Sequence, residues 1–391
     1  MLNRHPRNRL LSSFLLVAAL GCSDDGPASS DEAAETSGTE SSTTGEDTSG
    51  ADSTSTTDAG ESTDSTETAE SSSEESSSAD TRGCDALGFH VDGGALYDAN
   101  CNAFVIRGVN YPYAWYSWRD DTAEQFAAMA AAGANAVRIV LTDGAQWERV
   151  SGDEVAQVIG WARDNDMVAI LEVHDATGWS EQASAAPPST AVDYWLSDDV
   201  RAAVEGSEDH VLINIANEPM GNTTTEEWMP FHVGAIGDLR SAGIHHTLIV
   251  DAPNWGQDWT GTMRDGVQAQ SIFAADPDAN VMFSVHMYEV YDEDAKVESY
   301  VADFLGSGLA LLVGEFAADH GGPQVAAEAI MATAEASGVG YLGWSWSGNS
   351  AELASLDMVV DFSDQLTPWG QLLVDGPNGL QATAQTCSCF E

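Results

Sequence analysis

Eight short apolar runs recur through residues 84–391, and no other feature limits the possible folds as strongly. They cover residues 104–109, 136–141, 167–173, 211–216, 246–250, 281–287, 309–314 and 340–346. Helical patterns lie between them, for example at 122–132, 154–163 and 323–336. Strands alternating with helices in this way, and apolar at nearly every position, indicate a parallel sheet that is covered on both faces.

The number of runs favours a closed α/β barrel. Eight strand and helix units in roughly 300 residues suit a (β/α)8 TIM barrel better than an open sheet. An open doubly wound sheet is the alternative, but the Gly-x-Gly-x-x-Gly turn expected after its first strand is missing. Residues 89–99 contain Asp92-Gly93-Gly94 between two short apolar stretches, which predicts an N-terminal β-hairpin under the barrel.

The first 83 residues have a different composition. Arg4, Arg7 and Arg9 precede an apolar run at 10–20, and Ala19-Leu20-Gly21-Cys22 resembles a bacterial lipobox. Residues 23–83 hold 17 acidic side chains, 17 Ser and 12 Thr but no Val, Leu, Ile or aromatic residue. We therefore predict a lipoprotein-type signal peptide at 1–21, a disordered acidic Ser/Thr-rich linker at 22–83 and a (β/α)8 domain at 84–391.

This organisation predicts an exported protein. Lipidation of Cys22 would make it an outward-facing lipoprotein of the cell envelope, whose only contact with a membrane is the lipid anchor. An ordinary signal peptide and a secreted protein are the alternative. Cys84, Cys101, Cys387 and Cys389 then remain as disulfide candidates in an oxidising compartment.

The spacing of the cysteines suggests a pairing. A Cys387–Cys389 bond across one residue would be strained, so Cys84 and Cys101 are each expected to bond to one of the C-terminal pair. A zinc site is the alternative, although no Cys-x-x-Cys motif accompanies these residues.

Charge excludes several classes of protein. The chain has 63 acidic and 13 basic side chains, a net charge of −50, which argues against nucleic-acid binding. Its single lysine, Lys296, lies in the acidic run 292–296. Schiff-base lyases, pyridoxal enzymes and P-loop NTPases all need a lysine in an apolar or Gly-rich setting, so these classes are set aside.

Polar and aromatic side chains gather at the ends of the apolar runs. They are Asn110, Arg138, His174, Asp175, Asn217, Glu218, Asn254, Trp255, His286, Tyr288, Glu315 and Trp344. Taken singly, each has a structural explanation, such as a paired core arginine or a carboxylate in water. Together they converge on the rim where the carboxyl ends of barrel strands meet, which predicts an active site.

Glu218 and Glu315 give this site the residues for cleavage of a glycosidic bond. One carboxyl group can protonate the leaving oxygen while the other attacks the anomeric carbon. Tryptophan rings stack on pyranose faces, and several lie on or just after strand ends, although core packing explains some of them. They are Trp115, Trp118, Trp147, Trp179, Trp255, Trp259, Trp344 and Trp346.

Several segments resemble glycoside hydrolase family 5, and within it the bacterial endo-β-1,4-mannanases. They are residues 96–100, 107–110, 136–141, 171–178, 213–218, 286–288, 314–316 and 344–346. The resemblance implies Glu218 as acid/base and Glu315 as nucleophile, with retention of configuration. It also implies that the surrounding substrate-binding residues are Arg138, His174, Asn217, His286, Tyr288 and Trp344. We add Trp255 to these because it is an aromatic residue at a strand end.

The resemblance also implies the ligands. We expect β-mannan as the substrate, possibly with β-glucan, no cofactor and no metal, and a monomeric enzyme. Pro219 after the acid/base and Ala317 after Phe316 depart from the nearest mannanases, so an endo-β-1,4-glucanase stays an alternative. A non-catalytic carbohydrate-binding barrel and a metal-dependent barrel hydrolase are further alternatives. The latter usually has His-x-His after the first strand, where Val109-Asn110-Tyr111 stands.

The predicted anchor can be tested by phase partition. A lipidated Cys22 carries two or more acyl chains, enough for stable membrane attachment at about 0.8 kcal/mol per buried methylene. In a bacterial host, the wild type should enter the detergent phase, and Cys22→Ala should be unprocessed or should yield soluble, active enzyme. Wild-type protein found wholly in the aqueous phase, with a mature N-terminus other than Cys22, would contradict the prediction.

Overall fold

The structure is a computed structural model and describes residues 88–391. The predicted signal peptide and linker, and with them Cys22 and Cys84, lie outside the described residues.

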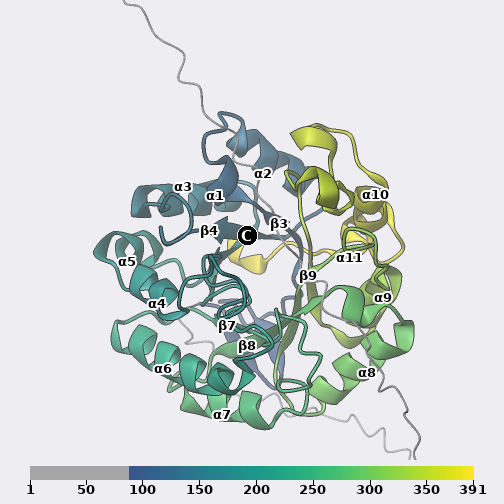
Figure 1. Cartoon of the computed structure of the whole chain (residues 1–391). Helices are drawn as coiled ribbons and strands as arrows, with labels where there is room; N and C mark the ends of the chain where they lie inside the picture. Colours follow the sequence, from purple (N-terminus) through teal and green to yellow (C-terminus); the bar gives the residue numbers. More distant parts are fainter. Residues whose placement is uncertain (1–87) are drawn as a thin grey trace, which may run out of the picture. The chain divides into compact units, whose positions relative to one another are not determined.

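The described chain forms a closed barrel of parallel strands, in the order β10-β3-β4-β5-β6-β7-β8-β9 around the ring (Figure 1). Every predicted apolar run overlaps one of its strands, so the predicted (β/α)8 TIM barrel is confirmed. The barrel strands are β3 (Arg107–Tyr111), β4 (Ala136–Leu141), β5 (Val168–Val173), β6 (Val211–Asn214), β7 (Leu248–Asp251), β8 (Val281–Met287), β9 (Leu311–Phe316) and β10 (Gly340–Gly343).

Helices surround the barrel in chain order (Figure 1). They are α1 (Tyr113–Tyr116), α2 (Thr122–Ala131), α3 (Gly152–Arg163), α4 (Ser189–Trp195), α5 (Asp198–Val204), α6 (Trp228–Ser241), α7 (Val267–Ala275), α8 (Asp294–Leu305), α9 (Ala327–Ser337), α10 (Pro368–Asp375) and α11 (Leu380–Thr383). Short 3₁₀ turns lie at η1 (Thr225–Glu227), η2 (Glu289–Tyr291), η3 (Ala351–Leu356), η4 (Val360–Phe362) and η5 (Ser388–Phe390). None of the helices in the described part of the chain has the length and hydropathy that a bilayer crossing requires.

Helix α3 illustrates how the sequence sets these elements. Ser151 and Glu154 form a capping box, in which each side chain accepts a hydrogen bond from the other's backbone N–H. Val155, Val158 and Ala162 recur at helical spacing and are buried against the sheet. The apolar stripe and the cap therefore agree on where this helix begins and which face it buries.

The inside of the barrel changes from apolar to polar along β4, β5, β6 and β7. Near the strand starts, Ile170, Leu212 and Ile249 fill the barrel floor. Because side chains on one face of a strand recur every second residue, the next inward positions are Glu172, Asn214 and Asp251. Ala136 is followed in the same way by Arg138. One layer of polar side chains therefore lies on an apolar floor. The packing of the floor sets the position of the polar layer along the barrel axis.

The predicted hairpin is present, with β1 (His90–Asp92) paired to β2 (Ala95–Tyr97) across Gly93 and Gly94. Both glycines have positive φ, 54° and 80°, which a tight two-residue turn of this kind requires. Phe89 and Leu96 pack into the same apolar cluster as the strand starts, so the hairpin closes the barrel floor as expected. Asn280 secures it by donating to the Phe89 carbonyl at 2.9 Å.

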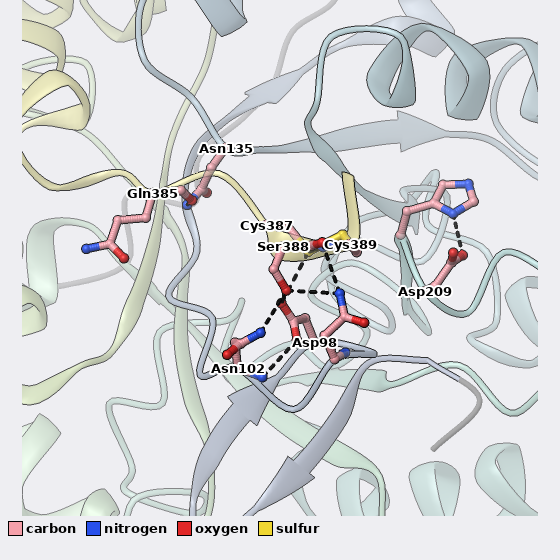
Figure 2. The surroundings of a disulfide bond; sticks show 10 residues. Asp98, Asn102, Asn135, Asp209, Gln385, Cys387, Ser388 and Cys389 are labelled. Carbon is pink, nitrogen blue, oxygen red and sulfur yellow. Dashed lines mark hydrogen bonds and ion pairs between the residues drawn. A yellow bond between two sulfur atoms is a disulfide. The ribbon is translucent and has the colours of Figure 1, made fainter. Parts of the chain in front are cut away.

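The predicted disulfide pairing is wrong. Cys387 and Cys389 are bonded to each other, with their Cα atoms 5.2 Å apart (Figure 2). The 3₁₀ turn at the C-terminus folds the chain enough to bring these atoms within the usual range for a disulfide. Cys101 is also disulfide-bonded, and therefore not to this pair.

The C-terminal turn nevertheless contacts the region that follows the hairpin, as the clasp hypothesis required. Ser388 Oγ donates to Asp98 Oδ2 at 2.5 Å, and Asn102 Nδ2 donates to Ser388 Oγ at 2.9 Å (Figure 2). Asn100 Nδ2 donates to the Ser388 carbonyl at 3.0 Å. Hydrogen bonds therefore join the two ends of the described domain, where the prediction had placed disulfides.

Candidate active site

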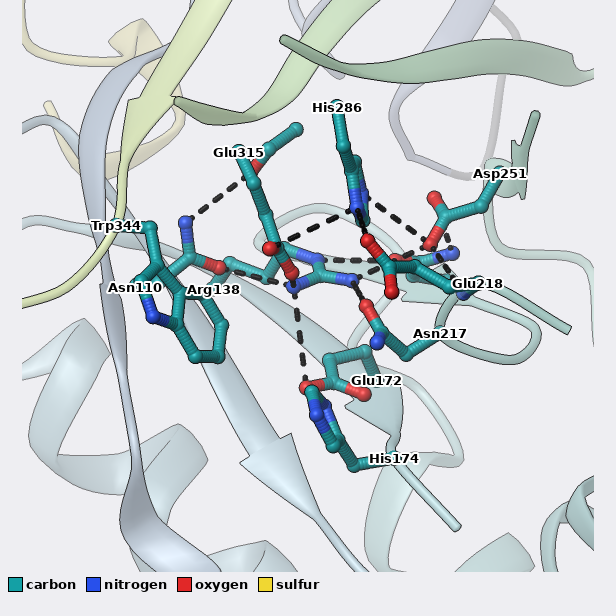
Figure 3. Close-up of polar contacts among 12 residues, drawn as sticks. Asn110, Arg138, Glu172, His174, Asn217, Glu218, Asp251, His286, Glu315 and Trp344 are labelled. Atoms are coloured by element: carbon teal, nitrogen blue, oxygen red, sulfur yellow. Dashed lines mark hydrogen bonds and ion pairs between the residues drawn. The ribbon is translucent and has the colours of Figure 1, made fainter. Parts of the chain in front are cut away.

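A buried arginine lies at the centre of the polar layer (Figure 3). The Arg138 side chain is 1% exposed and donates to Asn214 at 2.9 Å, to Asn110 at 2.9 Å and to Asn217 at 2.7 Å, in each case to Oδ1. It also donates to Glu315 Oε1 at 2.8 Å. Since Arg138 comes from β4 and its partners from β3, β6, β9 and the loop after β6, one guanidinium joins much of the barrel.

Glu315, near the end of β9, is held at both carboxyl oxygens. Arg138 binds Oε1, and the Tyr288 hydroxyl donates to Oε2 at 2.8 Å. The side chain is only 5% exposed. A charged donor on one oxygen and a neutral donor on the other fix the orientation of the carboxyl group, as a nucleophile requires.

Glu218, in the loop after β6, has different neighbours. Its Oε1 is hydrogen-bonded to His286 Nδ1 at 2.7 Å, and its backbone N–H donates to Asp251 Oδ2 at 3.2 Å. Its φ is 40°, a left-handed conformation that is uncommon outside glycine and is here supported by that backbone hydrogen bond. Among the ion pairs of the described residues, His286 is the only partner of the Glu218 carboxyl group.

The two carboxyl groups lie close together. One oxygen of Glu218, one of Glu315 and one nitrogen of His286 all lie within 4.8 Å of one another. Retaining glycosidases place their carboxyl groups about 5 to 5.5 Å apart, whereas inverting enzymes need about 6.5 to 9.5 Å to admit a water molecule. The separation therefore matches direct attack by a carboxylate.

Burial affects the protonation of the pair unequally. It raises the pKa of Glu218 well above its ordinary value, and the negative charges of Glu315 and Asp251 raise it further. Burial also raises the pKa of Glu315, to about 7, but the positive charge of Arg138 opposes that shift. Burial and the Arg138 charge lower the pKa of His286, so its imidazole is neutral. Glu218 is therefore the group that keeps its proton.

Aromatic rings form one wall beside the pair. Trp344 lies at the end of β10, and its ring stacks on the His174 imidazole with centroids 5.9 Å apart. Trp115 meets the edge of His174 at 5.0 Å and packs against Trp147 at 5.6 Å. His174 Nδ1 lies 3.0 Å from Glu172 Oε1, which fixes the ring. The peptide bond between Trp344 and Ser345 is cis.

Most of the predicted site residues meet in this network, whereas Trp255 lies outside it. Its indole N–H donates to Glu181 Oε2 at 2.8 Å, and its ring packs over Gly178. The next residue, Gly256, does contact the site. Its carbonyl oxygen accepts a hydrogen bond from the His286 backbone N–H at 2.8 Å.

Sequence reasoning did not assign three residues of the network to the site: Glu172, Asn214 and Asp251. Asp251 Oδ2 lies 3.4 Å from both Arg138 Nη2 and His286 Nε2. The available signal was a polar residue inside an otherwise apolar run, or directly after one. Such a residue on a strand covered on both faces needs a buried partner.

The carboxyl groups of Glu218 and Glu315, together with His286, could also supply one metal-ligand atom each. The guanidinium of Arg138 already contacts Glu315 at 2.8 Å, and Tyr288 occupies its other oxygen. A second positive charge beside Arg138 would be repelled, so the donor set fits a hydrogen-bonded acid pair better than a cation site.

Comparison with known proteins agrees with this geometry. Residues 97–350 match the family described as Cellulase (glycosyl hydrolase family 5). The chain belongs to glycosyl hydrolase family 5. Members of this family retain the configuration of the anomeric carbon, in agreement with the separation of the two carboxyl groups.

The chain is similar to several enzymes that are named as mannanases. The chain is 49% identical over 307 residues to a mannan endo-1,4-beta-mannosidase of Cellvibrio japonicus, covering 78% of this chain and 70% of the relative. A mannan endo-1,4-beta-mannosidase of Streptomyces lividans is 47% identical, with 78% of each chain covered. The mannohexaose complex of the β-mannanase from Thermomonospora fusca superposes with a TM-score of 0.73 at 45% identity, covering 78% of this chain and all of that one.

The role of Asp251 can be tested by pH dependence. Its negative charge raises the pKa of Glu218, so Asp251→Asn should lower that pKa and move the alkaline limb of kcat/KM by about one unit to lower pH. The acid limb, set by Glu315, should move less. Profiles on a soluble oligosaccharide measure both limbs. Asp276→Asn, a buried aspartate paired with Arg240 far from the site, is the matched control and should leave both limbs in place. An unchanged alkaline limb in Asp251→Asn would contradict this account.

Proposed function

We propose that the protein is an endo-β-1,4-mannanase, which cleaves β-mannan by double displacement with retention of configuration. The observation that carries the mechanism is the pair Glu218 and Glu315, with carboxyl oxygens within 4.8 Å and with unequal charge environments. Similarity to enzymes named mannan endo-1,4-beta-mannosidase supports the choice of substrate.

In the first step, Glu315 attacks the anomeric carbon, and the bond to the leaving oxygen breaks. Glu218 gives its proton to that oxygen, so the leaving half of the chain departs as an alcohol. Arg138 and Tyr288 hold Glu315 in position for the attack. Because its charge lies next to Arg138, Glu315 is the group that is ionised when Glu218 is still protonated.

In the second step, Glu218 has lost its proton and acts as a base toward water. The water attacks the anomeric carbon of the glycosyl ester, the bond to Glu315 breaks, and Glu218 is protonated again. His286 is hydrogen-bonded to Glu218 and near Asp251, so it keeps the Glu218 carboxyl oriented in both protonation states. The neutral imidazole adds no charge that would stabilise Glu218 as an anion.

The remaining side chains of the network suit a sugar in the cleaved position. Asn217 accepts from Arg138 with Oδ1 and donates to Thr177 with Nδ2, which leaves its second N–H for the 2-hydroxyl of the sugar. Trp344 and His174 offer stacked rings for the apolar face of the pyranose. Because mannan and glucan differ at the 2-hydroxyl, the surroundings of Asn217 act on the group that separates the two substrates.

The substrate assignment is tested by comparing polymers. We expect reducing-sugar release from linear β-mannan and galactomannan to exceed release from carboxymethylcellulose by at least about a hundredfold, that is, by about 2.7 kcal/mol of transition-state discrimination. β-Glucan is the second candidate, because the matching family is described as Cellulase. Equal or faster release from carboxymethylcellulose would favour that candidate and reject mannan.

The roles of the two glutamates are tested by leaving-group dependence. Glu315→Ala removes the nucleophile and should abolish turnover of every substrate. Glu218→Ala removes general acid catalysis and should lower kcat on mannan about a hundredfold or more. It should leave bond cleavage in a dinitrophenyl β-mannobioside nearly intact, since that leaving group needs no proton. The burst of dinitrophenol measures the bond-breaking step. If the Glu218 variant cleaves the aryl substrate no better than mannan, the roles are wrongly assigned.

A further inference from the structure

We propose that His320 is a positioning residue for the nucleophile and acts on it through Tyr288. His320 lies between β9 and α9, in the loop that follows Glu315. Its side chain is hydrogen-bonded to Glu289 and stacked on Tyr288, so it reaches the site from behind the groups that surround the substrate. This inference rests on the proposed function, because it takes Glu315 as the nucleophile.

The imidazole of His320 covers one face of the Tyr288 ring. The ring centroids are 4.4 Å apart and the two planes are inclined by 23°. Tyr288 is 5% exposed, and its hydroxyl donates to Glu315 Oε2 at 2.8 Å. A ring packed in this way cannot tilt without losing its stacking contact. The imidazole therefore limits the movement of the phenol that holds one oxygen of the nucleophile.

The orientation of the imidazole is fixed by Glu289. His320 Nδ1 lies 2.5 Å from Glu289 Oε2, and the other oxygen, Oε1, accepts from Gln257 Nε2 at 3.3 Å. Burial would raise the pKa of Glu289, but the hydrogen bond and the charge of His320 lower it below its ordinary value. An ionised carboxylate can only accept, so Nδ1 carries the proton and donates it.

Glu289 also links three loops around the tyrosine. It directly follows Tyr288 after β8, Gln257 lies in the loop after β7, and His320 lies in the loop after β9. The imidazole is thus held by the same stretch of backbone on which it packs. A change in the position of His320 is therefore passed on to Tyr288.

The backbone that carries His320 is an ordered turn. Asp319 and Gln324 pair as an antiparallel bridge, and the His320 N–H donates to the Pro323 carbonyl at 2.8 Å. Asp319 Oδ1 accepts from the Gly321 N–H at 3.0 Å, which closes the turn. The imidazole is therefore held from its backbone as well as from its Nδ1.

The protonation of Glu315 reports on this arrangement. Burial raises the pKa of Glu315, and the hydrogen bond from Tyr288 opposes that shift. A phenol that can tilt gives a weaker hydrogen bond, so Glu315 would ionise at higher pH. The titratable and charged groups that face the Glu315 carboxyl come from several strands. They are Arg138, Glu172, His174, Glu218, His286 and Tyr288.

The test uses dinitrophenyl β-mannobioside, because cleavage of its aryl bond needs the nucleophile but no proton from Glu218. His320→Ala removes the ring, and His320→Gln removes the ring but keeps a donor for Glu289. We expect both to lower the plateau of kcat/KM about three- to tenfold, as for loss of one aromatic contact. The acid limb should move by about half a unit to higher pH.

Two further variants separate stacking from general damage. His320→Phe keeps a flat ring on Tyr288, and it should recover most of the activity that His320→Ala loses. His245→Ala is the matched control. His245 is an exposed histidine paired with Asp278 at 2.7 Å, and it precedes β7 at the other end of the barrel. Its variant should have the plateau and the acid limb of the wild type.

A double-mutant cycle shows whether the effect passes through Tyr288. Tyr288→Phe keeps the ring but removes the hydroxyl that contacts Glu315. No hydroxyl is then left to orient, so adding His320→Ala to this background should lower kcat/KM by less than about twofold and leave the acid limb in place.

Two results would overturn the role of His320. One is a wild-type plateau and acid limb in His320→Ala and His320→Gln. The other is a full, independent loss in the Tyr288→Phe background, which would show that His320 only supports the fold. Failure of the proposed function is visible separately, because Glu315→Ala would then keep its turnover or the wild type would cleave the aryl β-cellobioside instead. In the second case the same variants are compared on that substrate.

Discussion

The buried guanidinium of Arg138 is the interaction on which the rest of the site depends. A charge in the barrel interior is stable only when it is paired and hydrogen-bonded, and Arg138 meets this condition through partners on four sides. Asn110 and Asn214 keep their amide groups turned inward because Arg138 uses their oxygens. Glu315 is oriented by the same group. Removing Arg138 would leave several buried acceptors without a donor. Both the arrangement of the site and the stability of the barrel therefore depend on this residue.

The charge of Arg138 also decides which carboxyl group is the acid. Glu172, Glu218, Asp251 and Glu315 surround a single cation, and all four cannot be ionised in a buried site. Burial raises the pKa of Asp251 as well, while Arg138 lowers it. Glu315 and Asp251 contact the guanidinium directly, whereas Glu218 contacts only the neutral His286. Glu218 is therefore the group that stays protonated and acts as the acid. Glu315 contacts the cation, so it is ionised and acts as the nucleophile.

Much of this architecture is predictable from sequence, because the strands are buried on both faces and appear as apolar runs. Their carboxyl ends meet at one rim, so the strand ends alone predict that Glu218 and Glu315 lie together. Glu172 and Asp251 were not assigned to the site, since pattern alone does not say what an inward polar residue bonds to. The cysteine pairing failed for another reason: it took a bond across one residue to be strained, whereas the turn at Ser388–Phe390 leaves the two Cα atoms 5.2 Å apart. Pairings across a short turn depend on local backbone geometry that spacing does not determine.

The loop after β7 holds the histidine that is hydrogen-bonded to the acid. Asn254, Trp255 and Gly256 have successive positive φ values of 58°, 55° and 69°, an arrangement that tertiary contacts must support. At Gly256 a Cβ atom would lie 2.6 Å from His286 Nδ1, the atom that is hydrogen-bonded to Glu218. A side chain at this position would therefore displace the imidazole. Asn254 joins the same loop to Asn222 and, through it, to Trp259. The backbone of this loop therefore fixes the position of the imidazole that orients the acid.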